Sequence, residues 1–314
     1  MPFALRRRLA AVFDRLQTQS ARARLHRSAV GLAAAGFVAH LLVVIVATLM
    51  PGLPQPLFAG IDRSLLHAVY TPFSIILFYE VVLLIFALAD SHTGEIATQY
   101  QIVSLIVIRR VFKDIGGFES FEHWLQEPET VRAVLLDMGG AMLMFLLVTV
   151  FTLLRRRVPR IPAEHDLNGF ITLKKALAML LLVVLSGLAL INLAVWLRLL
   201  PGTWLGLSQV PTNVDVFFFP LFFECMIFTD VFLLIVSLAY YDRYAYVFRN
   251  AGFVISTVLL RVSLSTPNPY DLAVALTAMA YGIMILAVFG WMMAIARPQV
   301  PRESPADLPT HAGS

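Results

Sequence analysis

Charged residues and cysteine are both scarce in this chain of 314 residues. Only 14% of the residues are charged, whereas a soluble domain carries about 25%. The one cysteine, Cys225, lies in an apolar run, which excludes an internal disulfide and any Cys-x-x-Cys redox or zinc site. Hydrophobic residues make up 59% of the chain, and this composition is typical of a membrane protein.

Motifs for catalysis and nucleotide binding are also missing. The sequence has no Gly-x-Ser-x-Gly, no His-Glu-x-x-His, no phosphate-binding glycine loop and no Rossmann fingerprint, so we predict neither an enzyme nor a cofactor. Two groups, His92 with Glu95 and Glu119 with Glu122 and His123, have too few ligands for a metal site, and we interpret them as solvated loop residues. The net charge of +4 comes from arginines beside apolar segments, so we expect no nucleic-acid partner.

Apolar segments long enough to cross a bilayer recur along the chain. A hydrocarbon core of about 30 Å needs roughly 20 helical residues at about 1.5 Å each. We therefore predict an all-α fold, a polytopic transmembrane helical bundle with about eight transmembrane helices. The predicted helices run from Ala29 to Met50, Leu65 to Ala89, Ile96 to Gly116, Ala133 to Leu154, Ala176 to Leu197, Val216 to Tyr241, Ala251 to Ser265 and Leu272 to Ala296.

The third and seventh of these segments are the weakest candidates for a complete crossing. The third has only 13 uncharged residues before Arg109, and the seventh is short and contains Arg261. For either one, a re-entrant or broken helix is the alternative.

Basic residues predict the orientation in the membrane. Seven arginines precede the first helix and six basic residues join the fourth to the fifth, so we expect both stretches in the cytoplasm. Eight crossings then put both termini in the cytoplasm, and the high arginine and alanine content suits a bacterial inner membrane. We expect the basic amphipathic segment at residues 1–28 to lie against anionic lipids, with a protein partner as the alternative.

Two stretches of the chain repeat at an offset near 150 residues. Residues 80–89 match residues 230–239 with six identities in ten, and Glu80 aligns with Asp230. A shift of two more residues aligns 102–109 with 254–261. At the first offset, Pro51-Gly52 and Pro201-Gly202 also align, where we expect the first and fifth helices to end.

These matches predict two tandem repeats of four helices, at residues 29–160 and 161–297, followed by a disordered proline-rich tail at 298–314. Each unit has an even number of crossings. The repeats should therefore be parallel and related by an axis along the membrane normal.

Charges within the apolar segments are the candidate functional residues. A charge at bilayer depth costs about 2.5 to 3.5 kcal/mol or more, so it usually faces the bundle interior and has a partner. Heights counted along the helices predict that Asp230 pairs with Arg261 and Glu80 with Arg109. The other intramembrane charges are Arg110, Asp137 and Glu224.

Two functions follow from these charges, and the sequence leaves both open. The first is a transporter or channel that moves protons, cations or a small solute through a path between the repeats. The alternative is a non-transporting membrane subunit, assembly factor or sensor whose intramembrane ion pairs are structural. A hydrated cavity that reaches the acids favours transport, whereas dry ion pairs favour the structural subunit.

Overall fold

The computed structural model describes residues 3–49, 68–89, 92–116, 128–158, 167–204, 215–240, 243–266 and 270–295. This part of the chain forms nine α-helices and no strand. The helices are α1 (Phe3–Leu16), α2 (Gln19–Leu49), α3 (Tyr70–Leu88), α4 (His92–Gly116), α5 (Pro128–Arg157), α6 (Leu167–Trp204), α7 (Asp215–Ser237), α8 (Tyr244–Ser265) and α9 (Tyr270–Ile295).

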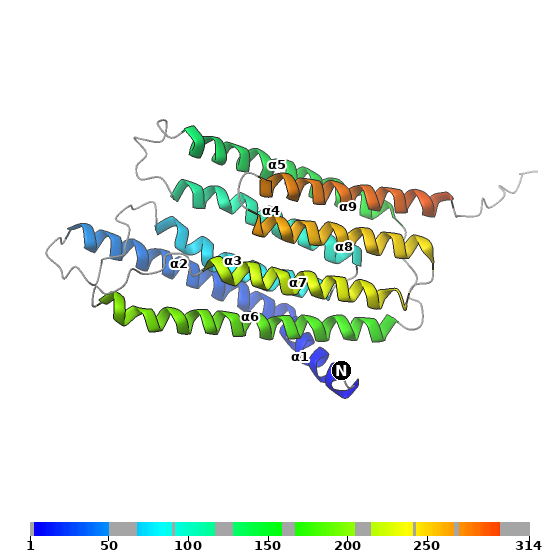
Figure 1. Cartoon of the computed structure of the whole chain (residues 1–314), viewed down its shortest axis with the longest axis horizontal. Helices are drawn as coiled ribbons and strands as arrows, with labels where there is room; N and C mark the ends of the chain where they lie inside the picture. The colour runs from blue at the N-terminus through cyan, green and yellow to red at the C-terminus, as the bar shows by residue number, and fades with distance from the viewer. Residues whose placement is uncertain are drawn as a thin grey trace, which may run out of the picture.

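Seven of these helices, α2, α3 and α5 to α9, are long and apolar enough to cross a membrane. The chain is therefore a multi-pass integral membrane protein with a helical bundle, as the sequence predicts. The helices α2 to α9 lie side by side along the long axis of the molecule (Figure 1). The helix α8 corresponds to the seventh predicted segment. It is one of these candidate membrane-spanning helices, although it contains Arg261.

The helix α4 has a different composition. It is 25 residues long but more polar than the seven candidate spans, and it corresponds to the predicted third crossing. It packs against α3, α5 and α8, so protein covers most of its polar side chains. An eighth crossing by α4 remains a prediction.

The order of packing follows the chain within each half of the bundle. Helices α2 to α5 pack each against the next, and so do α6 to α9. The two halves meet where α5 packs against α9, α4 against α8 and α3 against α6. Aromatic rings fill this junction: the ring centroid of Phe151 lies 5.0 Å from that of Tyr100 and 6.1 Å from that of Phe253.

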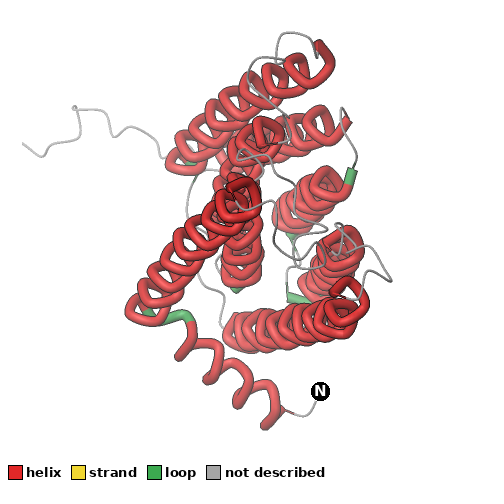
Figure 2. The backbone as a smooth tube through the Cα atoms, turned by 90° about the vertical axis from the view of Figure 1, so that its left-hand side faces the viewer, coloured by secondary structure: helices red, strands yellow, loops and turns green. Residues whose placement is uncertain are grey.

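The amphipathic helix α1 lies at one end of the bundle, which we call the inner end (Figure 1), and at its edge in the view along the helices (Figure 2). Its apolar face packs on α6, and the buried Phe13 ring makes an edge contact with Phe86 of α3 at 5.7 Å between centroids. Asp14 pairs with Lys175 of α6 at 2.7 Å. Its basic face, which carries Arg7, Arg8 and Arg15, is exposed.

The predicted end of the fifth helix differs from the structure. The helix α6 continues through Pro201-Gly202 to Trp204, so the expected end at this dipeptide is wrong. A proline removes a single N–H donor, and the helix continues beyond it for three residues. Pro51-Gly52, residues 117–127 and the tail 298–314 lie outside the described residues.

Candidate functional site

Both predicted ion pairs are present. Arg109 of α4 pairs with Glu80 of α3, and Arg261 of α8 pairs with Asp230 of α7. In each case the acid and the arginine lie on helices that follow one another in the chain and pack antiparallel. Thr257, one helical turn before Arg261, donates a second hydrogen bond of 3.0 Å to Asp230.

The Asp230–Arg261 pair belongs to a longer chain of polar contacts. Arg261 Nη2 donates to Gln99 Oε1 at 3.3 Å, and Gln99 Nε2 donates to Glu95 Oε1 at 3.2 Å. Lys174 Nζ then donates to the other oxygen of Glu95 at 2.8 Å. We call these five residues, Lys174, Glu95, Gln99, Arg261 and Asp230, the charge network.

The charge network crosses the junction between the two halves of the bundle. Glu95 and Gln99 lie one turn apart on the same face of α4, while the other members come from α6, α7 and α8. All five residues are buried, with exposed fractions from 1% to 7%. Buried charges are stable only when they are paired and hydrogen-bonded, and each charge of the network has a partner on another helix.

A small cavity of about 20 Å³ adjoins this network and includes Glu95, Lys174 and Asp230 in its lining. We call it the inner cavity. A water molecule needs about 10 to 15 Å³ of such space and two to four polar partners. The inner cavity therefore has room for about one water, and Glu95 and Asp230 both belong to its lining.

Asn250 of α8 supplies a further polar group to the inner cavity. Its Oδ1 accepts hydrogen bonds from Arg249 Nε and Nη2 at 3.2 and 2.8 Å, which fixes the orientation of the amide. Among the described residues, Asn250 Nδ2 is buried without a hydrogen-bond acceptor. A buried donor of this kind is normally satisfied by a bound water or ligand.

Towards the outer end of the bundle, α4 carries a second group of charges. Arg110 pairs with Asp271 in the first turn of α9, next to the Arg109–Glu80 pair. From Glu95 to Arg110, α4 covers about 22 Å along its axis at about 1.5 Å per residue. The polar residues of α4 thus follow most of the thickness of a bilayer core of about 30 Å.

The two remaining predicted residues lie apart from the inner cavity. Asp137 is buried on α5, near the outer end of the bundle. Glu224 lies on the exposed face of α7, and its side chain is not part of the charge network. The predicted charges therefore do not form one continuous site.

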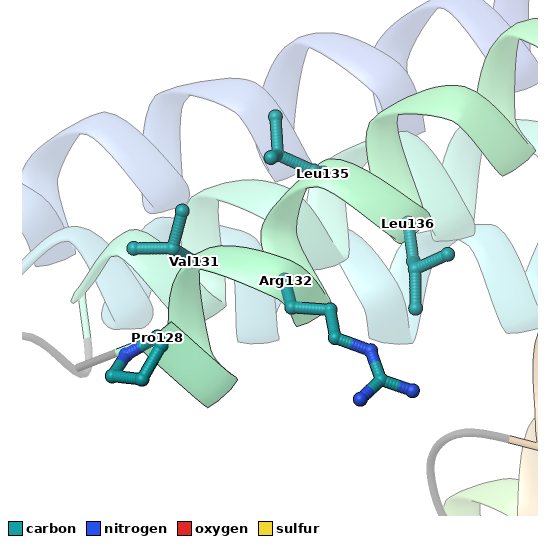
Figure 3. A pocket seen from close by; sticks show the side chains of 5 residues that line it. All are labelled: Pro128, Val131, Arg132, Leu135 and Leu136. Atoms are coloured by element: carbon teal, nitrogen blue, oxygen red, sulfur yellow. The ribbon is translucent and has the colours of Figure 1, made fainter. Parts of the chain in front are cut away.

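An open surface pocket of about 460 Å³ lies along the first turns of α5, at the outer end of the bundle. Figure 3 shows its lining side chains on the first turns of that helix, and they are Pro128, Val131, Arg132, Leu135 and Leu136. Arg132 is 3.8 Å from Glu129 on the same exposed turn. None of the predicted site residues belongs to this lining, so we do not assign it a role in the site.

Within the described residues, no three side chains among His, Cys, Asp and Glu are close enough to hold a metal ion. The expected loop position of Glu95 is wrong, because this residue lies in the first turn of α4 and is buried against Lys174. His92 also belongs to α4. The group at 119–123 lies outside the described residues.

Sequence reasoning missed three members of the charge network. Glu95 and Lys174 are hydrophilic residues at the ends of apolar segments, where charges are ordinary, and Gln99 is uncharged. One available signal was the spacing of Glu95 and Gln99, which puts two polar groups on one face of an otherwise apolar helix.

No known protein family, curated protein or solved structure matches this chain.

Proposed function

We propose that this protein moves protons across a membrane through a path that begins at the inner cavity. The observation that carries the proposal is the position of Glu95 and Asp230 on one water-sized cavity, with the buried Asn250 donor beside them. Carboxylates joined by a water molecule can exchange protons without large movements of the helices. In this path Glu95 receives the proton from the inner end and Asp230 takes it deeper into the bundle.

The size of the inner cavity favours a proton over a larger cation. The network holds two acids, Glu95 and Asp230, and two bases, Lys174 and Arg261, so a bound proton and a bound monovalent cation would each add one unit charge. A metal cation would also need several oxygen ligands in a space that holds about one water molecule. A proton needs no such space, because it adds to a carboxylate oxygen.

We further propose that the bundle consists of two tandem repeats, α2 to α5 and α6 to α9. The two acid–arginine pairs support this, since both join the second helix of a unit to its third. The matching order of packing within each half also supports it. The path then runs along α4 where the two repeats meet, and the arginines around α1 favour a cytoplasmic inner end in a bacterial inner membrane.

The experiment is a proton-flux measurement in vesicles that contain the purified protein and an internal pH-sensitive dye. A potassium gradient with valinomycin supplies the driving voltage. We expect flux with the wild type and loss of flux with Glu95→Gln and Asp230→Asn. Asp14→Asn is the matched control, because it removes an ion pair with Lys175 on the surface of the same bundle end.

A second candidate function is a structural membrane subunit, and a specific observation favours it. Five ion pairs join different helices, so each can serve to hold the bundle together. The Glu80–Arg109 pair is not part of the lining of the inner cavity. Absence of flux with folded wild-type protein, together with loss of stability in the variants, would select this function.

A further inference from the structure

Glu224 differs from the acids in the interior of the helical bundle. Among the described residues, Glu80, Glu95, Asp137, Asp230 and Asp271 are all buried. Glu224 instead lies on the outward face of α7, nine residues from the start of the helix and thirteen from its end. At about 1.5 Å per residue it is about 13 Å from the outer end of the helix, at the depth of the hydrocarbon core.

The residues around Glu224 form a strongly apolar face. Leu221 is 47% exposed, Phe228 73% and Ile235 61%, and their spacing of three, four and seven residues puts them in line with Glu224. Lipid tails can cover the apolar side chains of this face but offer no hydrogen bond to a carboxyl group. A carboxylate in such a position is unfavourable unless a charged or hydrogen-bonding group of another molecule covers it.

We infer that this face of α7 binds a transmembrane helix of another protein that carries a basic side chain at the depth of Glu224. Charge complementarity identifies the partner, because a lysine or arginine is the side chain that compensates a carboxylate best in low dielectric. The inference does not depend on the proposed proton path, since Glu224 lies outside the inner cavity.

A second copy of this chain fits this face less well. Two copies in the same membrane have the same orientation, so the cation of one copy must lie at the depth of Glu224 in the other. Arg198, which is exposed on α6, lies 24 residues beyond Lys174, or about 36 Å along the helix. Glu224 lies 13 residues from Ser237, which shares the inner cavity with Lys174, or about 20 Å from it. Arg198 and Glu224 are therefore at different depths. Arg109 and Arg110 lie nearer the depth of Glu224, about 21 and 22 Å from Glu95 along α4, but they are paired with Glu80 and Asp271.

The test measures energy transfer in lipid vesicles between the full-length protein, labelled at its C-terminus, and a labelled synthetic helix. The probe is a single-span leucine–alanine peptide with one lysine at its centre, and the control peptide has leucine at that position. For the wild type we expect about tenfold tighter association with the lysine peptide than with the control. Because Glu224 is exposed, Glu224→Leu should fold normally and lose this preference, whereas Phe228→Leu on the same face should keep it.

Glu224→Gln is the second variant, and it should weaken the preference because the amide keeps the shape of the side chain but not its charge. Equal association with both peptides overturns the proposal. An unchanged preference in both Glu224 variants also overturns it. The third outcome concerns energy transfer between differently labelled copies of the wild type. If this transfer occurs and is lost in Glu224→Leu, the face binds a second copy, and the proposal is overturned as well.

Discussion

Arg261 of α8 donates a hydrogen bond to Gln99 of α4, a residue 162 positions earlier in the chain. This contact joins the two halves of the bundle through side chains that are both nearly inaccessible to solvent. Through Gln99, the Asp230–Arg261 pair reaches Glu95 and Lys174. The proposed proton path depends on this connection, because it keeps the carboxylates of Glu95 and Asp230 in the lining of the inner cavity.

Replacing Gln99 should separate the two ion pairs of the charge network. Gln99→Leu removes a donor to Glu95 and an acceptor of Arg261, and hydrogen bonds to charged groups contribute about 1.5 to 3 kcal/mol each. We expect lower thermal stability and flux close to that of Glu95→Gln in the vesicle assay. Gln101→Leu, on the exposed face of α4, is the control and should resemble the wild type. Normal stability and flux in Gln99→Leu would contradict the connection.

Breaking the Asp230–Arg261 pair should be strongly destabilising. Asp230→Ala or Arg261→Ala leaves one buried charge without its partner, which costs about 3 to 5 kcal/mol. Unfolding in detergent, followed by circular dichroism, measures the loss. The double variant Asp230→Leu with Arg261→Met should recover much of it, because an apolar pair of similar volume carries no desolvation cost. Additive losses in the double variant would show that the two residues do not act as a pair.

An exposed ion pair provides the comparison for this experiment. Glu129 and Arg132 lie 3.8 Å apart on the first turn of α5, and both side chains are largely solvent-accessible. Such pairs contribute about 0 to 1 kcal/mol. Glu129→Ala should therefore change the unfolding midpoint much less than Asp230→Ala.

Close packing at Gly282 should make α9 sensitive to a single methyl group. A Cβ at this position would lie 2.9 Å from Ser256 Oγ and still closer to the Tyr100 hydroxyl. The hydroxyl groups of Tyr100 and Ser256 hydrogen-bond to each other, and Ser256 donates to the carbonyl of Ala278 at 2.7 Å. We expect Gly282→Ala to lower stability by about 1 to 3 kcal/mol, measured by thermal unfolding.

The double variant Gly282→Ala with Tyr100→Phe should be more stable than Gly282→Ala alone, because it removes the hydroxyl that meets the new methyl group. Gly139→Ala is the matched control, since nothing lies within 4 Å of a Cβ there. In that open position alanine is the better helix former, by about 0.5 to 1 kcal/mol. Equal effects at Gly139 and Gly282 would contradict the close contact of α9 with Tyr100.

Anionic lipid should stabilise the protein through the arginines at the inner end. Arg8, Arg15 and Arg24 are exposed on α1 and the start of α2, and each basic residue near an anionic surface contributes about 1 kcal/mol. We expect the unfolding temperature in nanodiscs to rise when phosphatidylglycerol replaces part of the phosphatidylcholine. The triple change of these arginines to glutamine should reduce that rise, and high salt should reduce it in the wild type. An equal rise in the triple variant would contradict the expected contact.

The contacts that sequence reasoning reached are those between helices adjacent in the chain. Glu80 and Arg109 lie on α3 and α4, and Asp230 and Arg261 lie on α7 and α8. Consecutive membrane helices run antiparallel and pack together, so counting residues from their shared end is enough to place two side chains at one height. Apolar length and rare charges therefore predicted the helical membrane bundle and both of these pairs.

The contacts that sequence reasoning missed join helices that are far apart in the chain. Glu95 meets Lys174 and Gln99 meets Arg261 only because the two halves of the bundle pack with α4 against α8 and α3 against α6. The same packing leaves Glu224 on the outside, although its position in an apolar helix resembles that of Asp230. Composition and hydrophobic length determined that this chain enters a membrane as helices, because every backbone polar group must be satisfied there within the segment. The tertiary packing decided which face of each helix meets protein and which meets lipid. Side chains of equal hydrophobicity all around a helix do not indicate where its neighbouring helices lie.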